Sequence, residues 1–259
     1  MEDVLDLSGR SVLVTGGARG LGRGIAEAFL ARGADVATCG RTDPGSPPSV
    51  DGRAATFLRA DVRDADAVAQ LIADVVAQHG HLDVVINNAG GGPPAFVAGT
   101  SPRLHAGIIT LNLIAPLFVA QRANDVMQAQ DGGGCIINIA STNGIHPSPG
   151  VAAYGAAKAG LISLTESLAA EWAPRVRVNA VTAGLIGSDE IFAVHYANDP
   201  DRLARLQAGV PMGRFSTPDD VAGACLYLAS PLAAQVTGAN VLVHGGGDPA
   251  DALPDRPPR

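Results

Sequence analysis

Several residue types are scarce in this sequence, and each shortage argues against a class of protein. The 259 residues include only three cysteines, far apart at Cys39, Cys135 and Cys225, which argues for buried thiols and against a disulfide framework. No cluster of cysteine and histidine points to a metal site. Basic residues number 18 against 25 acidic ones, a net charge of -7, whereas nucleic-acid binding calls for a basic surface. We therefore expect no metal and no nucleic-acid partner.

Membrane and export signals are also missing. No apolar stretch approaches the roughly 20 residues that span a bilayer. The N-terminus, MEDVLDLSGR, lacks the basic and then apolar layout of a signal peptide. These absences predict a cytoplasmic protein with no membrane segment. The hydrophobic content of 47% suffices for one sizeable core.

Apolar runs and amphipathic segments alternate along the chain. Strands are expected near residues 11–15, 35–39, 55–59, 83–87, 135–140, 176–181 and 240–243. Helices are expected near 21–33, 64–79, 102–130, 152–173, 189–208 and 217–229. This alternation is typical of a parallel sheet covered on both faces. We predict one α/β domain over residues 1–247, a doubly wound sheet of about seven strands, with a loop at 42–52 and a C-terminal tail at 248–259.

A glycine-rich turn follows the first expected strand. Residues 11–22 read SVLVTGGARGLG, in which Gly16, Gly20 and Gly22 lie between an apolar run and a helical pattern. Glycines let the backbone approach a pyrophosphate closely, and the helix N-terminus then offers N–H groups to it. This context predicts a dinucleotide-binding turn.

A second pattern lies in the middle of the chain. Tyr154 and Lys158 are four residues apart, so they share a helix face, and Ser141 lies thirteen residues before Tyr154. An ammonium beside a phenol favours the phenolate, so we expect Lys158 to lower the pKa of Tyr154 and make it an acid/base group. Alone, the pair is far more typical of a surface tyrosine and a solvated lysine than of a catalytic pair.

Taken together, these motifs resemble those of the short-chain dehydrogenase/reductase family in its short single-domain form. The pattern T-G-x-x-x-G-x-G begins at Thr15, Asn87-Asn88-Ala89-Gly90 matches the family's N-N-A-G motif, and Asn112 matches a catalytic asparagine. The resemblance covers about residues 8–245. It implies a Rossmann-type fold and an NAD(P)-dependent oxidoreductase that interconverts a secondary alcohol and a ketone.

The resemblance also implies roles for single residues. Tyr154 exchanges the proton, Lys158 assists it and contacts the nicotinamide ribose, Ser141 orients the substrate oxygen, and Asn112 holds a water. An alternative for Asn112 is a polar residue at a helix kink before Pro116. The implied cofactor-binding residues are Gly16, Arg19, Gly20, Leu21, Gly22, Arg41, Asp61, Val62, Asn88, Ala89, Gly90, Tyr154, Lys158, Gly184, Ile186 and Ser188.

Cofactor preference is expected to depend on the end of the second strand. An NAD-preferring site usually has a carboxylate there, where this chain has Gly40. Arg41 follows and Arg19 lies in the glycine turn, and two guanidiniums suit a 2′-phosphate. We therefore expect NADP rather than NAD. The alternative is two solvated arginines, partly offset by Asp43.

The segment after the sixth strand departs from the family pattern. Relatives show P-G-x-x-x-T where this chain has Ala-Gly-Leu-Ile-Gly-Ser at 183–188, which puts the cofactor carboxamide contacts in doubt. Residues 185–212 are expected to form a substrate lid. Its apolar side chains favour a bulky hydroxy or oxo compound, a 3-oxoacyl thioester or a steroid-like molecule, over a sugar.

Other interpretations stay open at this point. A non-catalytic nucleotide sensor could use the same fold, although this chain keeps the four catalytic residue types. Enoyl reductases usually separate the tyrosine and lysine by six residues rather than three. Relatives are commonly tetramers, so the resemblance implies a homo-oligomer, a tetramer or a dimer, acting on a small-molecule substrate.

Overall fold

A computed structural model describes residues 4–187 and 200–247. Its main sheet has seven strands in the order β5-β2-β1-β6-β7-β8-β9, and every neighbouring pair is parallel. The strands are β1 (Ser11–Thr15), β2 (Asp35–Gly40), β5 (Thr56–Arg59), β6 (Val84–Asn87), β7 (Gly134–Ser141), β8 (Val176–Ala183) and β9 (Asn240–Val243). The predicted doubly wound α/β fold and its strands are confirmed.

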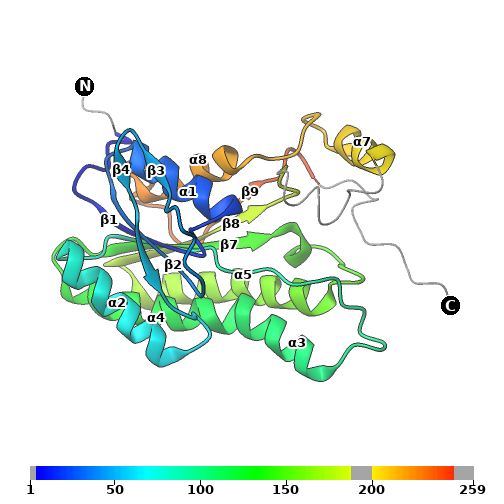
Figure 1. Cartoon of the computed structure of the whole chain (residues 1–259), viewed down its shortest axis with the longest axis horizontal. Coiled ribbons are helices and arrows are strands. Elements are labelled where there is room, and N and C mark those ends of the chain that lie inside the picture. The colour runs from blue at the N-terminus through cyan, green and yellow to red at the C-terminus, as the bar shows by residue number, and fades with distance from the viewer. Residues whose placement is uncertain (1–3, 188–199, 248–259) are drawn as a thin grey trace.

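Helices cover both faces of this sheet. They are α1 (Gly20–Ala31), α2 (Ala65–His79), α3 (Pro102–Ile109), α4 (Ala115–Ala129), α5 (Ala152–Trp172), α7 (Pro200–Gly209) and α8 (Pro218–Ala229), with short turns η1 (Thr110–Ile114), η2 (Thr142–Gly144) and η3 (Pro231–Ala233). In Figure 1, α1 and α8 lie on one side of the sheet and α2, α4 and α5 on the other. This is the layered arrangement that the alternating sequence predicts.

Two hydrophobic clusters fill the space between sheet and helices. Val12 and Val14 of β1 pack in the cluster that contains Phe29 of α1, whereas Leu13 between them packs in the cluster of α2 and α4. Successive side chains of a strand point to opposite faces, so a strand that is apolar throughout is buried on both sides. The apolar run thus fixes β1 in the centre of the domain.

One short hairpin interrupts a segment expected to be a loop. β3 (Ser49–Val50) and β4 (Arg53–Ala54) pair antiparallel within and just beyond residues 42–52. Asp51 and Gly52 between them have φ angles of 49° and 80°. Aspartate followed by glycine is the dipeptide that suits such a tight two-residue hairpin turn. The loop prediction is therefore wrong for residues 49–50, which are strand, and holds for the turn at residues 51–52.

The helix expected over residues 102–130 is continuous but not regular. A π-helical turn, η1, joins α3 to α4 and places Asn112 inside it, fully buried. By length and composition this stretch, Pro102–Ala129, is apolar enough to cross a membrane, with a mean hydropathy of 1.6 in its best window. One third of that window is buried in the structure, where α4 packs against α2 and β7.

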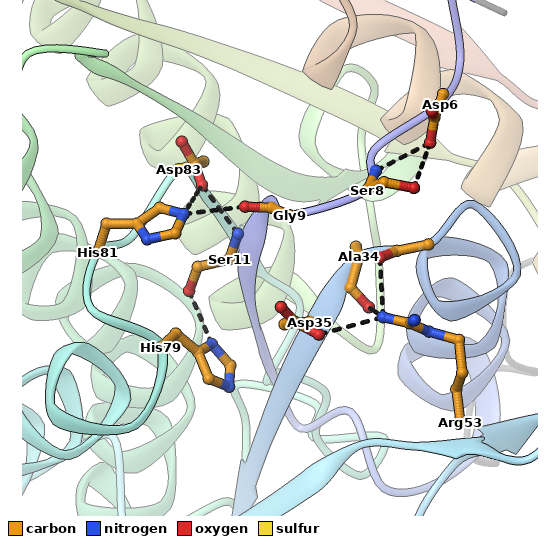
Figure 2. Close-up of polar contacts among 11 residues, drawn as sticks. Asp6, Ser8, Gly9, Ser11, Ala34, Asp35, Arg53, His79, His81 and Asp83 are labelled. Atoms are coloured by element: carbon orange, nitrogen blue, oxygen red, sulfur yellow. Dashed lines mark hydrogen bonds and ion pairs between the residues drawn. The ribbon is translucent and has the colours of Figure 1, made fainter.

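The amino-terminal edge of the sheet is held by polar contacts (Figure 2). The carboxylate of Asp83 accepts hydrogen bonds from the backbone N–H of Ser11 at 2.8 Å and from Nη1 of Arg10 at 2.9 Å. Nε2 of His81 lies 2.9 Å from the same carboxylate, and Nδ1 of His79 lies 2.8 Å from Oγ of Ser11. These groups lie at the start of β1, at the end of the sheet opposite the carboxyl ends of the strands.

The expected substrate lid, residues 185–212, is described in part. The helix expected at 189–208 is seen as α7 from Pro200, and residues 188–199 and the expected tail at 248–259 lie outside the described residues. Leu206, Val210 and Phe215 form a small separate cluster with Leu185 and Leu203 against it. Of the described part of this segment, Leu185, Leu203, Leu206 and Val210 thus pack together with Phe215, whereas Ile186 packs against the main core.

Candidate active site

A cleft of about 1410 Å³ opens at the carboxyl ends of the strands. Its walls come from the loops after β1, β2, β5, β6, β7 and β8 and from α5. The predicted site residues that line it are Gly16, Arg19, Gly20, Leu21, Gly22, Arg41, Asp61, Val62, Asn88, Ala89, Gly90, Ser141, Tyr154, Lys158, Gly184 and Ile186. Ser188 lies outside the described residues. Asn112 is not in the cleft wall.

Close packing explains the glycines of the first turn. Gly16 and Gly20 have φ angles of 63° and 52°, which L side chains rarely adopt. A Cβ on Gly22 would lie 2.4 Å from Nδ2 of Asn88. A Cβ on Gly17, a position outside the predicted set, would lie 2.7 Å from Cγ2 of Thr38. A side chain at Gly17 or Gly22 would collide with β2 or with the loop after β6, so the glycines let the turn pack closely against both.

Thr15 joins this turn to the loop after β6. Its Oγ1 accepts hydrogen bonds from the backbone N–H groups of Asn88 and Ala89, both at 3.0 Å. Nδ2 of Asn88 donates back to the carbonyl oxygen of Thr15 at 3.0 Å. The N-N-A-G motif thus braces the glycine turn. Asn87 does not take part, because it is buried in β6, where its Nδ2 donates to Oδ1 of Asn138.

The N-terminus of α1 faces the cleft without a competing cap. Arg19, the N-cap residue, makes no side-chain capping bond, and the first turn contains no acidic residue. Free N–H groups and the positive end of the helix dipole suit an anion such as a pyrophosphate. Together with Gly16 and Gly20, whose positive φ angles shape the backbone beside this helix end, these residues fit a dinucleotide.

Arginines surround the far end of the cleft. Gly40 ends β2, so no carboxylate stands at that position, and the exposed side chains of Arg19 and Arg41 have no hydrogen-bond or ion-pair partner among the described residues. Asp61 is held by Arg63, whose Nη2 lies 2.6 Å from Oδ2. The Arg63 guanidinium lowers the pKa of Asp61, with a smaller effect from Arg41. Arg19 and Arg41 thus line this end of the cleft without a hydrogen bond or ion pair to a described residue.

Three side chains meet at the other end. Ser141 ends β7, while Tyr154 and Lys158 project from one face of α5. The ammonium of Lys158 is buried and lies 5.7 Å from the centre of the Tyr154 ring. It donates a hydrogen bond to the carbonyl oxygen of Ile139 at 2.7 Å. An ammonium has three donors, so two remain for a ligand or for water.

The pKa of Tyr154 differs from the expectation. Burial raises the pKa of the phenol, and a hydrogen bond from Ser141 opposes that rise. Burial also lowers the pKa of Lys158 to about 8. The prediction that Lys158 brings the phenol pKa down is therefore wrong for this structure. Removing both groups from water disfavours their charged forms, and the spacing of residues carries no information on this effect.

Asn112 connects the π turn to Gly91, a residue of the cleft wall. Its Nδ2 donates to the carbonyl oxygens of Gly91 at 2.8 Å and Ile108 at 2.9 Å, and its Oδ1 accepts from the N–H of Gly91 at 2.8 Å. The side chain thus holds the loop after the N-N-A-G motif and satisfies a carbonyl of the irregular helix. This matches the alternative of a polar residue at a helix irregularity before Pro116.

Among the polar side chains of the cleft that the sequence prediction omitted is Asn143. It follows Ser141 by two residues, lines the cleft, and lies close to the serine hydroxyl. Across residues 4–187 and 200–247, no group of three or more histidine, cysteine, aspartate or glutamate side chains could hold a metal ion. All three cysteines are buried and free, as expected.

Comparisons with known proteins fit this geometry. A family model described as enoyl-(acyl carrier protein) reductase matches residues 16–247. The chain belongs to the short-chain dehydrogenase/reductase family. An uncharacterised oxidoreductase of Mycobacterium tuberculosis is 38% identical over 94% of each chain. A 3β-hydroxysteroid dehydrogenase of Eggerthella lenta is 37% identical over 93% of this chain and 94% of its own length.

A solved structure is similar throughout. It is described as an NAD(P)-dependent gluconate 5-dehydrogenase from Beutenbergia cavernae with NADP bound at low occupancy. The TM-score is 0.86 and the identity 34%, covering 94% of this chain and 98% of the other. The family assignment makes this protein an oxidoreductase that acts on CH–OH groups with NAD(P).

Proposed function

We propose that this short-chain dehydrogenase/reductase interconverts a secondary alcohol and a ketone with Tyr154 as the proton-transferring group. The observation that carries the proposal is the meeting of Ser141, Tyr154 and Lys158 in a cleft whose other end fits a dinucleotide. When bound in this cleft, a nicotinamide dinucleotide would provide or take up the hydride at the carbinol carbon. The chain's own residues hold the substrate oxygen and move its proton.

Ser141 and Tyr154 bind the substrate oxygen together. In the reduction direction, the neutral phenol donates its proton to the oxygen as the carbonyl becomes an alcohol. The raised pKa of Tyr154 keeps the phenol protonated near neutrality, which is the form that this step needs. The Ser141 hydroxyl and the Lys158 ammonium then stabilise the phenolate that remains. Asn112 supports the site by holding Gly91; its role in holding a water stays a prediction.

Replacement of Tyr154 tests the proposal. In Tyr154→Phe we expect turnover to fall by about a hundredfold or more, because general acid–base catalysis of this kind contributes at least that much. Nicotinamide absorbance reports the rate, and circular dichroism and dinucleotide binding show that the variant folds. A folded, dinucleotide-binding variant with near-normal turnover would contradict the role of Tyr154. No turnover by the unmodified protein, despite dinucleotide binding, would favour the nucleotide-sensor alternative.

We also propose NADP as the preferred cofactor. Arg19 and Arg41 lie at the cleft without described partners, and Asp61 is already paired with Arg63. We expect Arg41→Ala to lower kcat/KM for NADP(H) by about tenfold to a hundredfold, the range for a lost hydrogen bond to a charged group. The value for NAD(H) is expected to change little.

A matched control is Arg53→Ala. Arg53 is also exposed, but it bonds Asp35 and the carbonyls of Gly33 and Ala34 at the other end of β2 (Figure 2). It is expected to leave both cofactors unaffected. Equal losses with NADP(H) and NAD(H) in Arg41→Ala would contradict the assignment of Arg41 to a 2′-phosphate.

For the substrate we propose a bulky oxo or hydroxy compound, a 3-oxoacyl thioester or a steroid-like alcohol. Apolar residues of the cleft near the catalytic groups, including Pro94, Val151 and Leu185, support this choice, as does the steroid dehydrogenase among the relatives. The gluconate 5-dehydrogenase makes sugar acids the first compounds to test against it. Nicotinamide absorbance with a panel of all three classes decides the order.

We further propose that the protein is a homo-oligomer, a dimer or tetramer, without a membrane segment. The apolar helix from α3 to α4 supports the oligomer, since Leu104 is 40% exposed and Ile109 is 37% exposed on it. A second copy packed on this helix would cover them. The cytoplasmic location stays a prediction from the sequence.

A further inference from the structure

The turn after β7 brings an amide to the catalytic serine. Ser141 caps the short helix η2, and its Oγ accepts a hydrogen bond from the backbone N–H of Asn143 at 3.3 Å. Nδ2 of Asn143 lies 3.5 Å from the same oxygen, at the long end of the hydrogen-bond range. Two donors from one residue therefore approach the oxygen of Ser141.

The direction in which the Ser141 hydroxyl proton points depends on the acceptors within its reach. A hydroxyl has one proton to donate and two lone pairs to accept with. Since both contacts from Asn143 are donated to Oγ, the serine proton has no role in them. The phenol oxygen of Tyr154 can accept this proton, and the Ser141 hydrogen bond opposes the rise in the Tyr154 pKa. A bond that lowers an acid's pKa is one donated to its ionised form.

Close packing fixes the turn that presents Asn143. A Cβ on Gly155, the residue after Tyr154, would lie 2.7 Å from the carbonyl oxygen of Asn143. A Cβ on Gly144 would lie 2.8 Å from the backbone of α5 at Lys158. Oγ of Ser148 donates to the carbonyl oxygen of Asn143 at 2.9 Å. The turn is thus pressed against the helix that bears the catalytic pair, which leaves the Asn143 side chain little freedom of position.

We propose that Asn143 is a positioning residue that donates to Ser141 and so directs the serine proton toward Tyr154 and the substrate oxygen. The inference rests on the proposed function and deepens it. Asn143 carries no charge and takes no proton in the reaction. It acts by setting which way the serine hydroxyl points, and donation to that hydroxyl makes it a stronger donor in turn.

Two variants of Asn143 test the direction of the hydrogen bonds from Asn143 through Ser141 to Tyr154. Asn143→Ala removes the side-chain donor, and Asn143→Asp keeps the shape but can only accept. In both we expect kcat to fall by about three- to tenfold, the range for one lost hydrogen bond. The limb of the pH profile for alcohol oxidation, which follows ionisation of Tyr154, is expected to move up by about half a pH unit or more. KM for the dinucleotide is expected to stay unchanged.

Ser148→Ala is the matched control. It removes a contact to the same turn but leaves the side-chain amide of Asn143 in place, so the pH profile is expected to stay where it is. If Ser148→Ala moved the pH limb as far as the Asn143 variants do, the shift would come from the conformation of the turn and not from the Asn143 amide, which would overturn the proposal. An unchanged pH limb in both Asn143 variants would also overturn the proposal. If Asn143→Asp behaved like the unmodified protein, the amide would accept from Ser141 rather than donate, and the proposal would be wrong.

A measurement without substrate separates this inference from the proposed function. The ultraviolet absorbance of the phenolate, taken as the difference between each protein and its Tyr154→Phe counterpart, reports the ionisation of Tyr154 alone. We expect more alkaline titration in Asn143→Asp and Asn143→Ala than in the unmodified protein. Identical titration curves would contradict the inference even if every substrate failed, whereas failure of turnover alone would count against the proposed function.

Discussion

A buried ammonium at the catalytic site affects stability as well as chemistry. The side chain of Lys158 is 3% exposed, and burial lowers its pKa to about 8 from an ordinary 10.5. Below pH 8 the folded and unfolded chains both carry the proton, and the folded state bears the full unfavourable effect of burying the charge. Between pH 8 and 10.5 the unfolded chain binds more protons than the folded one, so this contribution to stability improves as the pH rises.

We expect this pH dependence to disappear in Lys158→Met. Compared with that variant, the unmodified protein should gain about 2 kcal/mol in its free energy of unfolding between about pH 7 and about pH 9.5. Urea unfolding of both proteins at several pH values measures the difference, and subtracting the two cancels other titrating groups. A difference that stays constant with pH would show that Lys158 titrates normally.

At the scale of single residues, the sequence predicted positions better than energies. The spacing of Tyr154 and Lys158 placed them on one helix face, as the structure confirms. The direction of the Tyr154 pKa was wrong, because it depends on how much water the folded chain removes from the phenol. Asn143 was missed for a related reason: its contact with Ser141 depends on the shape of a turn, and no spacing rule encodes that shape.

At the scale of elements, helix α8 is stabilised at its N-terminus by side-chain capping. Thr217 and Asp220 form a capping box, in which Oγ1 of Thr217 accepts from the N–H of Asp220 and Oδ2 of Asp220 accepts from the N–H of Thr217. Arg214 pairs with Asp220 and holds the pKa of that carboxyl well below its usual range. The N-terminal end of α8 also packs closely against α1, since a Cβ on Gly24 of α1 would lie 2.4 Å from Pro218.

We expect Thr217→Ala to destabilise the protein by about 1 kcal/mol, the usual effect of losing an N-cap side chain. Thr217→Ser keeps the hydroxyl and is expected to retain nearly full stability. Urea unfolding at neutral pH compares the three proteins. If the serine variant lost as much as the alanine variant, the methyl group and not the cap would be responsible.

The elements that the sequence predicted are those with strong periodicity. All seven strands of the main sheet were found within a few residues. The five inner strands are largely buried runs bounded by turns, whereas the edge strands β5 and β9 are only partly buried. The hairpin at 49–54 was missed, since strands of two residues carry no periodic signal. The π turn at Thr110–Ile114 was missed as well, because one extra residue leaves the apolar pattern of a long helix almost unchanged.

At the scale of the whole molecule, the exposed apolar helix makes assembly testable. We expect the unmodified protein to sediment as a dimer or tetramer, and Ile109→Glu to shift it toward a smaller species, because a charge would be buried in the interface. Val97→Glu is a control on an exposed apolar side chain outside the helix, in the loop before α3. A protein that sediments as a monomer, or is unaffected by Ile109→Glu, would contradict an interface at this helix.

The π turn has a consequence for the length of the chain. A π turn is an α-helix with one residue too many, so η1 is in effect a single-residue insertion between α3 and α4. Removing one residue there would let the helix close into regular α-helical bonding and would turn one half about its axis relative to the other. Asn112 would then leave Gly91, and the loop after the N-N-A-G motif would lose its support. The π turn therefore sets the position of Asn112 relative to Gly91. A helix shorter by one residue would be regular but would misplace this contact.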